Sequence, residues 1–76
     1  MEQLDRITHN SGVMGGHACI RGMRVTVAML VGQIADGRAV EALLKDYPYL
    51  EREDVAQALR YAAWLAQERE VVLAQA

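Results

Sequence analysis

The sequence of 76 residues predicts a mainly α-helical fold, in which a short N-terminal β-hairpin or arm precedes three helices, the last of them long. Four glycines punctuate the first 22 residues, where the apolar side chains show no helical period. From Thr26 onward, apolar residues recur at helical spacing, and the single proline, Pro48, interrupts them. We therefore expect one domain over residues 1–76, with the β arm in 1–25 and the three-helix part in 26–76.

Two short strands are expected near Arg6 to His9 and Ala18 to Arg21, because these runs lie between glycine-rich turns. The Gly15-Gly16 pair between them lacks the Lys-Ser/Thr ending of a phosphate-binding loop. We interpret the pair as a turn.

The first helix is expected to begin after Thr26, whose hydroxyl can cap it, and to run through Ile34. It ends where Gly37 can take the left-handed conformation. The second helix, at about 39–46, stops before Pro48, because the ring removes a backbone donor and restricts the preceding residue.

The third helix is expected from about Glu51 to Leu73, with carboxylates crowded at its start, where the helix dipole favours them. Its predicted core stripe consists of Val55, Ala58, Leu59, Ala62, Leu65, Ala66 and Leu73. A second set of side chains lies outside that stripe and is called the aromatic strip here: Tyr61, Trp64, Glu68 and Val71. Exposed aromatic residues are enriched at protein interfaces, so we expect this strip to contact a partner, unless a loop or the N-terminal arm covers Trp64.

The second and third helices have the proportions of a helix-turn-helix over about 39–66, in a homeodomain-like three-helix arrangement. If the third helix enters the major groove of DNA, Arg52 and Gln57 are the expected base contacts and Arg60 the expected phosphate contact. The carboxylates at the helix start oppose this, because they repel phosphate. A dimer could offset them with Arg21 and Arg24 from its arms.

Arg21 and Arg24 flank a Gly22-Met23 turn, and two interpretations of them remain open. Their guanidinium forks can hold a carboxylate or a phosphate across an interface. Alternatively, Arg24 caps helix carbonyls or pairs with Asp36 inside the chain.

No metal site, cofactor or enzymatic activity is expected. His9, His17 and Cys19 are three ligands where a structural zinc site needs four. A serine, a histidine and a carboxylate do not occur in a recognisable catalytic pattern. One cysteine cannot form an internal disulfide, and there is neither a signal segment nor an apolar run near 18 residues, so a cytoplasmic protein without a membrane span is expected.

Size and charge point to a protein partner more than to bulk nucleic-acid binding. A chain this short buries only about 60% of its unfolded surface on folding, so self-association or another partner is expected. The net charge is −2, with +1 in residues 1–38 and −3 in residues 39–76. Any nucleic-acid face must therefore be local and built from few arginines.

Several short blocks, from about Ile7 to Ala63, resemble the DUF433 family of small prokaryotic proteins, many of which are grouped as antitoxins. The blocks are Gly15 to Val27, Asp36-Gly37, Tyr47-Pro48-x-Leu50, Asp54-Val55 and Ala58-Leu59-x-Tyr61-Ala62. This chain departs from the family pattern where Met23 replaces a usual Thr, where Ala18-Cys19 replaces a usual Pro, and where Ala39 replaces a usual Ser or Thr.

The resemblance implies a dimeric antitoxin that binds a cognate toxin, often a PIN-like ribonuclease, and that represses its own operon by binding operator DNA. For toxin contact we favour Arg60, Trp64 and the C-terminal turns of the last helix. Two alternatives are a stand-alone DNA-binding regulator and a dimeric interaction module that does not bind DNA.

Overall fold

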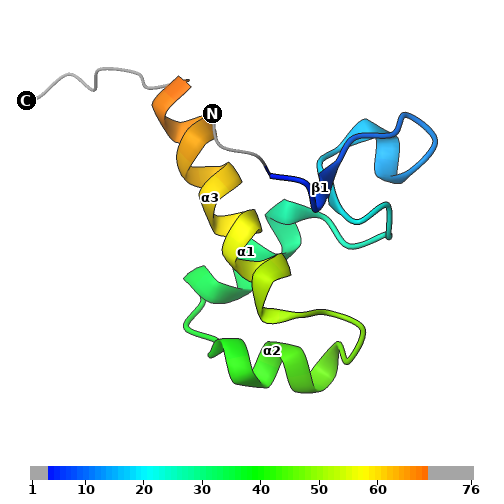
Figure 1. The fold of residues 1–76 in the computed structure, drawn as a ribbon. Helices are drawn as coiled ribbons and strands as arrows, with labels where there is room; N and C mark the ends of the chain where they lie inside the picture. The colour runs from blue at the N-terminus through cyan, green and yellow to red at the C-terminus, as the bar shows by residue number, and fades with distance from the viewer. Residues whose placement is uncertain (1–3, 69–76) are drawn as a thin grey trace, which may run out of the picture.

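A computed structural model describes residues 4–68 and confirms the predicted fold class, a mainly helical chain with a short N-terminal hairpin. The three helices are α1 (Val27–Ala35), α2 (Val40–Asp46) and α3 (Arg52–Glu68). Figure 1 shows α1 crossing behind α3, α2 at the lower end of α3, and the hairpin to one side. The predicted end of the last helix near Leu73 lies outside the described residues.

The hairpin pairs β1 (Ile7–Thr8) with β2 (Cys19–Ile20) in antiparallel register, with Ile7 opposite Ile20. Both strands fall inside the predicted runs but are only two residues long. A 3-10 turn, η1 (Met14–Gly16), lies in the connection, where Gly15 and Gly16 have φ of 65° and 84°. The glycine pair thus forms a turn, as predicted, because these positive φ values suit glycine.

The helix boundaries follow from local chemistry. The Thr26 hydroxyl accepts a hydrogen bond from the Met29 N–H at 3.0 Å and caps α1, as predicted. Gly37 lies just after the end of α1 and takes the left-handed conformation, with φ of 94°. Ala39 precedes α2 without a side-chain cap, because alanine has no hydroxyl to accept a hydrogen bond from the helix N–H groups.

The core lies between α1, the start of α3 and the hairpin. Its buried residues are Ile20, Val25, Val27, Leu30, Leu43, Leu50, Val55 and Ala58. The predicted core stripe of α3 is correct for Val55 and Ala58 but not for Leu59, which is 39% exposed, nor for Ala66, which is exposed. Ala66 is exposed because α1 has only nine residues and α3 extends beyond it (Figure 1). Leu59 lines instead an open pocket with Val40 of α2.

Within residues 4–68, no helix is both long enough and apolar enough to cross a membrane.

Candidate functional site

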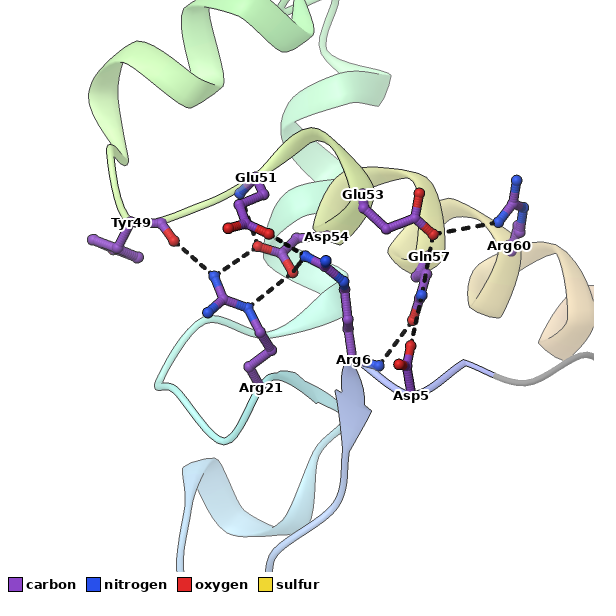
Figure 2. A network of polar contacts seen from close by, with 9 residues as sticks. All are labelled: Asp5, Arg6, Arg21, Tyr49, Glu51, Glu53, Asp54, Gln57 and Arg60. Carbon is purple, nitrogen blue, oxygen red and sulfur yellow. Dashed lines mark hydrogen bonds and ion pairs between the residues drawn. The ribbon is translucent and has the colours of Figure 1, made fainter.

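A buried carboxylate organises the start of α3. Asp54 is fully buried, and its carboxylate accepts hydrogen bonds from two arginines of the hairpin region (Figure 2). Arg21 Nε donates to Asp54 Oδ1 at 3.0 Å and Arg21 Nη2 donates to Oδ2 at 2.9 Å, so the guanidinium binds the carboxylate in a bidentate manner. Arg6 Nη1 donates to Oδ1 at 3.0 Å, and the Glu51 N–H donates to Oδ2 at 2.8 Å.

The hairpin places the two arginines together because one precedes β1 and the other follows β2. The Arg21 N–H donates to the Arg6 carbonyl at 2.7 Å, which fixes the two backbones side by side. Arg21 Nη2 also donates to the Tyr49 carbonyl at 2.7 Å, and Arg6 Nη1 donates to Glu51 Oε1 at 2.6 Å. These bonds join the hairpin to the connection between α2 and α3 (Figure 2).

The pKa values reflect this cluster. Burial alone would raise the pKa of Asp54, but hydrogen bonds from Arg21, from the Glu51 N–H and from Arg6 outweigh it, so that the pKa of the carboxyl is lowered. The pKa of Arg6 is raised by its hydrogen bonds to Glu51 and Asp54. That of Arg21 is raised by its hydrogen bond to Asp54. All three groups are therefore charged in the folded protein.

The Arg21 guanidinium binds inside the chain and does not point toward a partner. Its guanidinium fork does hold a carboxylate, as one interpretation proposed, but the carboxylate belongs to Asp54 of the same chain. The sequence placed Asp54 only among the carboxylates that the helix dipole favours at the start of the third helix, whereas the structure makes it the centre of the cluster. The sequence carried one usable signal, because an acid at the third position of a helix can reach back to the backbone N–H that precedes the helix.

Gln57, predicted as a base contact, is also engaged inside the chain. It is 6% exposed, its Oε1 accepts the Arg6 N–H at 2.9 Å, and its Nε2 donates to Asp5 at 2.9 Å and to Glu53 at 3.1 Å. Residue 57 lies three positions after Asp54 and so shares its helix face toward the hairpin. A base contact by Gln57 would require these bonds to break.

The remaining predicted DNA contacts lie on the surface, each beside another side chain. Arg52, 63% exposed, donates to Glu41 at 2.8 Å, and this hydrogen bond lowers the pKa of Glu41. Arg60 lies 3.7 Å from Glu53. The exposed Arg24 reaches the Met14 sulfur at 3.9 Å and not Asp36. The outer face of α2 and α3 is therefore nearly balanced in charge.

An open apolar groove of about 940 Å³ lies between α1 and α3. We call it the α1–α3 groove; α1 lines it with Val27, Ala28, Val31 and Gly32, and α3 lines it with Tyr61, Ala62 and Leu65. His9, Gly16, His17, Ala18 and Thr26 line it from the N-terminal region.

One residue of the aromatic strip, Tyr61, lines this groove, and Trp64 packs against it. The Tyr61 hydroxyl is 3.1 Å from His9 Nε2, and the Tyr61 and Trp64 ring centroids are 6.0 Å apart. Trp64 is half-buried. It is therefore neither fully exposed nor fully covered, the two alternatives that the sequence left open. The side chain of Glu68 and all of Val71 lie outside what the structure describes.

The three potential metal ligands, His9, His17 and Cys19, do not converge on one site in the described part of the chain. His9 faces Tyr61, while the Cys19 thiol is buried and donates to the His17 carbonyl at 3.3 Å. Across residues 4–68, no group of three or more His, Cys, Asp or Glu side chains is arranged to hold a metal ion.

These features define a small, mainly helical domain in which the charged cluster serves the fold and an apolar groove remains open. Residues 7–62 match the family model described as a protein of unknown function (DUF433). The chain therefore belongs to the DUF433 family, as its sequence blocks predicted.

Two proteins are similar to this chain. An uncharacterized protein, y4eO, of Sinorhizobium fredii (strain NBRC 101917 / NGR234) is 34% identical over 56 residues, which are 74% of this chain and only 25% of that protein. A crystal structure of a DUF433 member from Anabaena variabilis ATCC 29413 is 34% identical, with a TM-score of 0.78, and the match covers 84% of this chain and 63% of that one.

Proposed function

We propose that this protein is an antitoxin-like, non-enzymatic component of a toxin-antitoxin pair, which neutralises a cognate toxin, such as a PIN-like ribonuclease, by direct binding. The family resemblance suggests this role. In the structure, the observation that supports it most is the partly covered second half of α3, where the Tyr61 and Trp64 rings pack against each other and Tyr61 lines the α1–α3 groove.

The aromatic strip suits a protein partner for physical reasons. Tyrosine and tryptophan supply large, rigid contact area and are over-represented among residues that dominate binding energy. Trp64 is already supported on one side by the Tyr61 ring, which in turn contacts His9, so little side-chain entropy is lost on binding. Arg60, one position before Tyr61, could add charge complementarity to an acidic metal-binding site of such a toxin.

A non-catalytic role fits the chemistry of the charged residues. Three titratable groups whose pKa values are shifted, Asp54, Arg6 and Arg21, bind one another and hold the hairpin against α3. Perturbed groups at a catalytic site are poised for proton transfer in a cleft. In this chain they are committed to structural hydrogen bonds.

The experiment is growth rescue with the adjacent reading frame. The neighbouring product is expressed alone and then together with this chain, and the complex is tested by copurification. We expect toxicity alone, rescue together, and a stable complex. Trp64→Ala should weaken that complex by about 2 kcal/mol, roughly thirtyfold in Kd.

Tyr49→Ala is the matched control, because Tyr49 is also an exposed aromatic residue, at 50%, but lies in the α2–α3 connection. It should leave the affinity unchanged. A harmless neighbour that does not copurify would refute the proposal, and equal losses from both variants would remove the aromatic strip from it.

Operator binding, as a homodimer, is a second proposed activity, and one observation favours it. Two of the three carboxylates at the start of α3 are compensated within the chain: Asp54 is buried against arginines, and Glu51 pairs with Arg6. The repulsion expected from the sequence is therefore reduced, and Arg52 and Arg60 remain on the solvent side.

DNA binding predicts a steep fall of affinity with salt concentration, because neutralised phosphates release counterions. Arg60→Ala should weaken binding to all sequences, whereas Arg52→Ala should relax specificity at one base pair by about 1–3 kcal/mol. Retained operator affinity in both variants would contradict this assignment and would favour an interaction module that does not bind DNA.

A further inference from the structure

Arg24 differs from the other arginines of residues 4–68 in having no acidic partner. Each of the others pairs with a carboxylate of the same chain: Arg6, Arg21, Arg38, Arg52 and Arg60. Arg24 is exposed, and its one polar contact among the described residues is with the Met14 sulfur, at 3.9 Å. A thioether is a weak acceptor, so most of the five N–H donors of this guanidinium remain available to an anion from outside the chain.

The hairpin connection holds Met14 beside Arg24 in an unfavourable backbone conformation. Met14 has φ of 49°, in the left-handed region that methionine rarely adopts, and its side chain is 39% exposed. Glycine would take this conformation without steric cost. The core does not use Met14 either. A role for its exposed side chain at an interface accounts for a methionine here, because methionine adapts its shape to a partner.

Arg24 and Met14 together are called the hairpin patch here. The turn η1 carries Met14 and ends at Gly16, and Gly16 lines the α1–α3 groove. Tyr61 lines the same groove from α3, and its hydroxyl lies 3.1 Å from His9 Nε2 of the hairpin region. The hairpin patch therefore lies next to the surface that Tyr61 belongs to, and one partner can cover both.

The charge of the hairpin suits a carboxylate of a protein better than the backbone of a nucleic acid. Phosphate backbones are bound by several cations at once. Arg6 and Arg21 point to Asp54 (Figure 2), so Arg24 is the guanidinium that residues 4–24 leave without a carboxylate. Arginine and methionine are both enriched at protein interfaces, and a guanidinium can bind a carboxylate through two parallel hydrogen bonds.

We propose that the hairpin patch is a second contact surface for the protein partner, in which Arg24 binds a carboxylate of that partner and Met14 packs against an apolar side chain beside it. This inference rests on the proposed function, because it requires a partner protein. It assigns the contact to a different element from Trp64, so the two surfaces can be tested separately.

The test is the affinity of the full chain for the neighbouring product that copurifies with it, measured by isothermal titration calorimetry at two salt concentrations. Arg24→Met removes the charge and keeps an apolar side chain, and it should raise Kd by about tenfold or more. Arg24→Lys keeps the charge but lacks the planar fork, and it should raise Kd by about threefold. The Kd of Arg24→Met should also depend less on salt than that of wild type.

Lys45→Met is the matched control, because Lys45 is an exposed cation in the last turn of α2. It should leave Kd within about twofold of wild type. Thermal unfolding by circular dichroism should give nearly the same Tm for Arg24→Met as for wild type, because the Arg24 side chain is exposed and has no ion pair in the described chain to lose.

An Arg24→Met variant that binds within about twofold of wild type would overturn the inference, as would an equal loss in Lys45→Met or a clearly lowered Tm. If Trp64→Ala still weakens that complex, the proposed function stands without the hairpin patch. If no product copurifies, both fail. Loss of operator binding in Arg24→Met, with an unchanged protein complex, would assign Arg24 to nucleic acid and would also overturn the inference.

Discussion

Replacing Asp54 by asparagine tests whether the buried carboxylate holds the hairpin to α3. The side-chain volume is conserved, so packing is nearly unchanged, but the two oxygens of Asp54 each accept two hydrogen bonds. Oδ1 accepts from Arg6 and Arg21, and Oδ2 accepts from Arg21 and the Glu51 N–H. Whichever way the amide is turned, its NH₂ group faces two donors, so asparagine can satisfy one pair and must oppose the other.

The expected cost follows from burial. Removing one partner of a buried ion pair costs about 3–5 kcal/mol, because the remaining charge is uncompensated. The guanidinium side chains here keep some access to solvent, 27% for Arg6 and 38% for Arg21, so they can be partly rehydrated. We therefore expect Asp54→Asn to lose about 3 kcal/mol, a large part of the roughly 4–11 kcal/mol that a chain of this length commonly has.

Urea unfolding followed by circular dichroism measures this loss as a lower midpoint at an unchanged slope. Glu53→Gln is the control, because it removes a carboxylate one residue earlier that is about half exposed, and it should change stability by no more than about 0.5 kcal/mol. A loss below about 1 kcal/mol in Asp54→Asn, or equal losses in the two variants, would refute the idea that the cluster stabilises the fold.

Three further predictions follow from the same structure. The pKa of Asp54 is lower in the folded than in the unfolded chain, so the ionised carboxylate stabilises the fold fully above the unfolded pKa of about 4. This stabilisation is lost as the pH falls through the folded pKa. The difference in urea midpoint between wild type and Asp54→Asn should therefore disappear below that pH. Thr26→Ala should cost about 1 kcal/mol in the same assay, since it leaves the Met29 N–H without its cap; no loss would contradict the capping role. Ala39→Ser should instead gain about 0.5–1 kcal/mol by capping α2, and a destabilised variant would show that the helix start cannot use a hydroxyl.

Much of the fold was predictable because its signals are local. Thr26, Gly37 and Pro48 act through their own backbone or within one turn, so the helix boundaries near them could be placed from sequence. The hairpin was also placed correctly, although its strands are short. The reach of the core along α3 was not predictable from periodicity, because Ala66 has the right phase and only the length of α1 decides whether it is covered.

The candidate site was harder to predict because its contacts are distant in sequence. Arg6 and Arg21 meet Asp54 across 48 and 33 residues, and no spacing rule links them. The sequence left open whether arginines of the arm face DNA or a partner, or pair inside the chain. In the fold, the hairpin register brings two of them to one carboxylate, and Gln57 is drawn into the same polar layer. Arg52 and Arg60 stay on the surface, where they are 63% and 52% exposed.

The two halves of α3 therefore differ in what holds them. The first half is fixed by a buried carboxylate, two arginines and the core residues Val55 and Ala58, so a substitution there acts on folding. The second half has only partial cover from α1; it lines one side of the α1–α3 groove and carries Tyr61 and Trp64. Because the first half is anchored by contacts that do not involve the second, a surface change at Trp64 can alter binding without unfolding the chain. Loss of binding in that variant, with unchanged helical content, would therefore report on the interface and not on the fold.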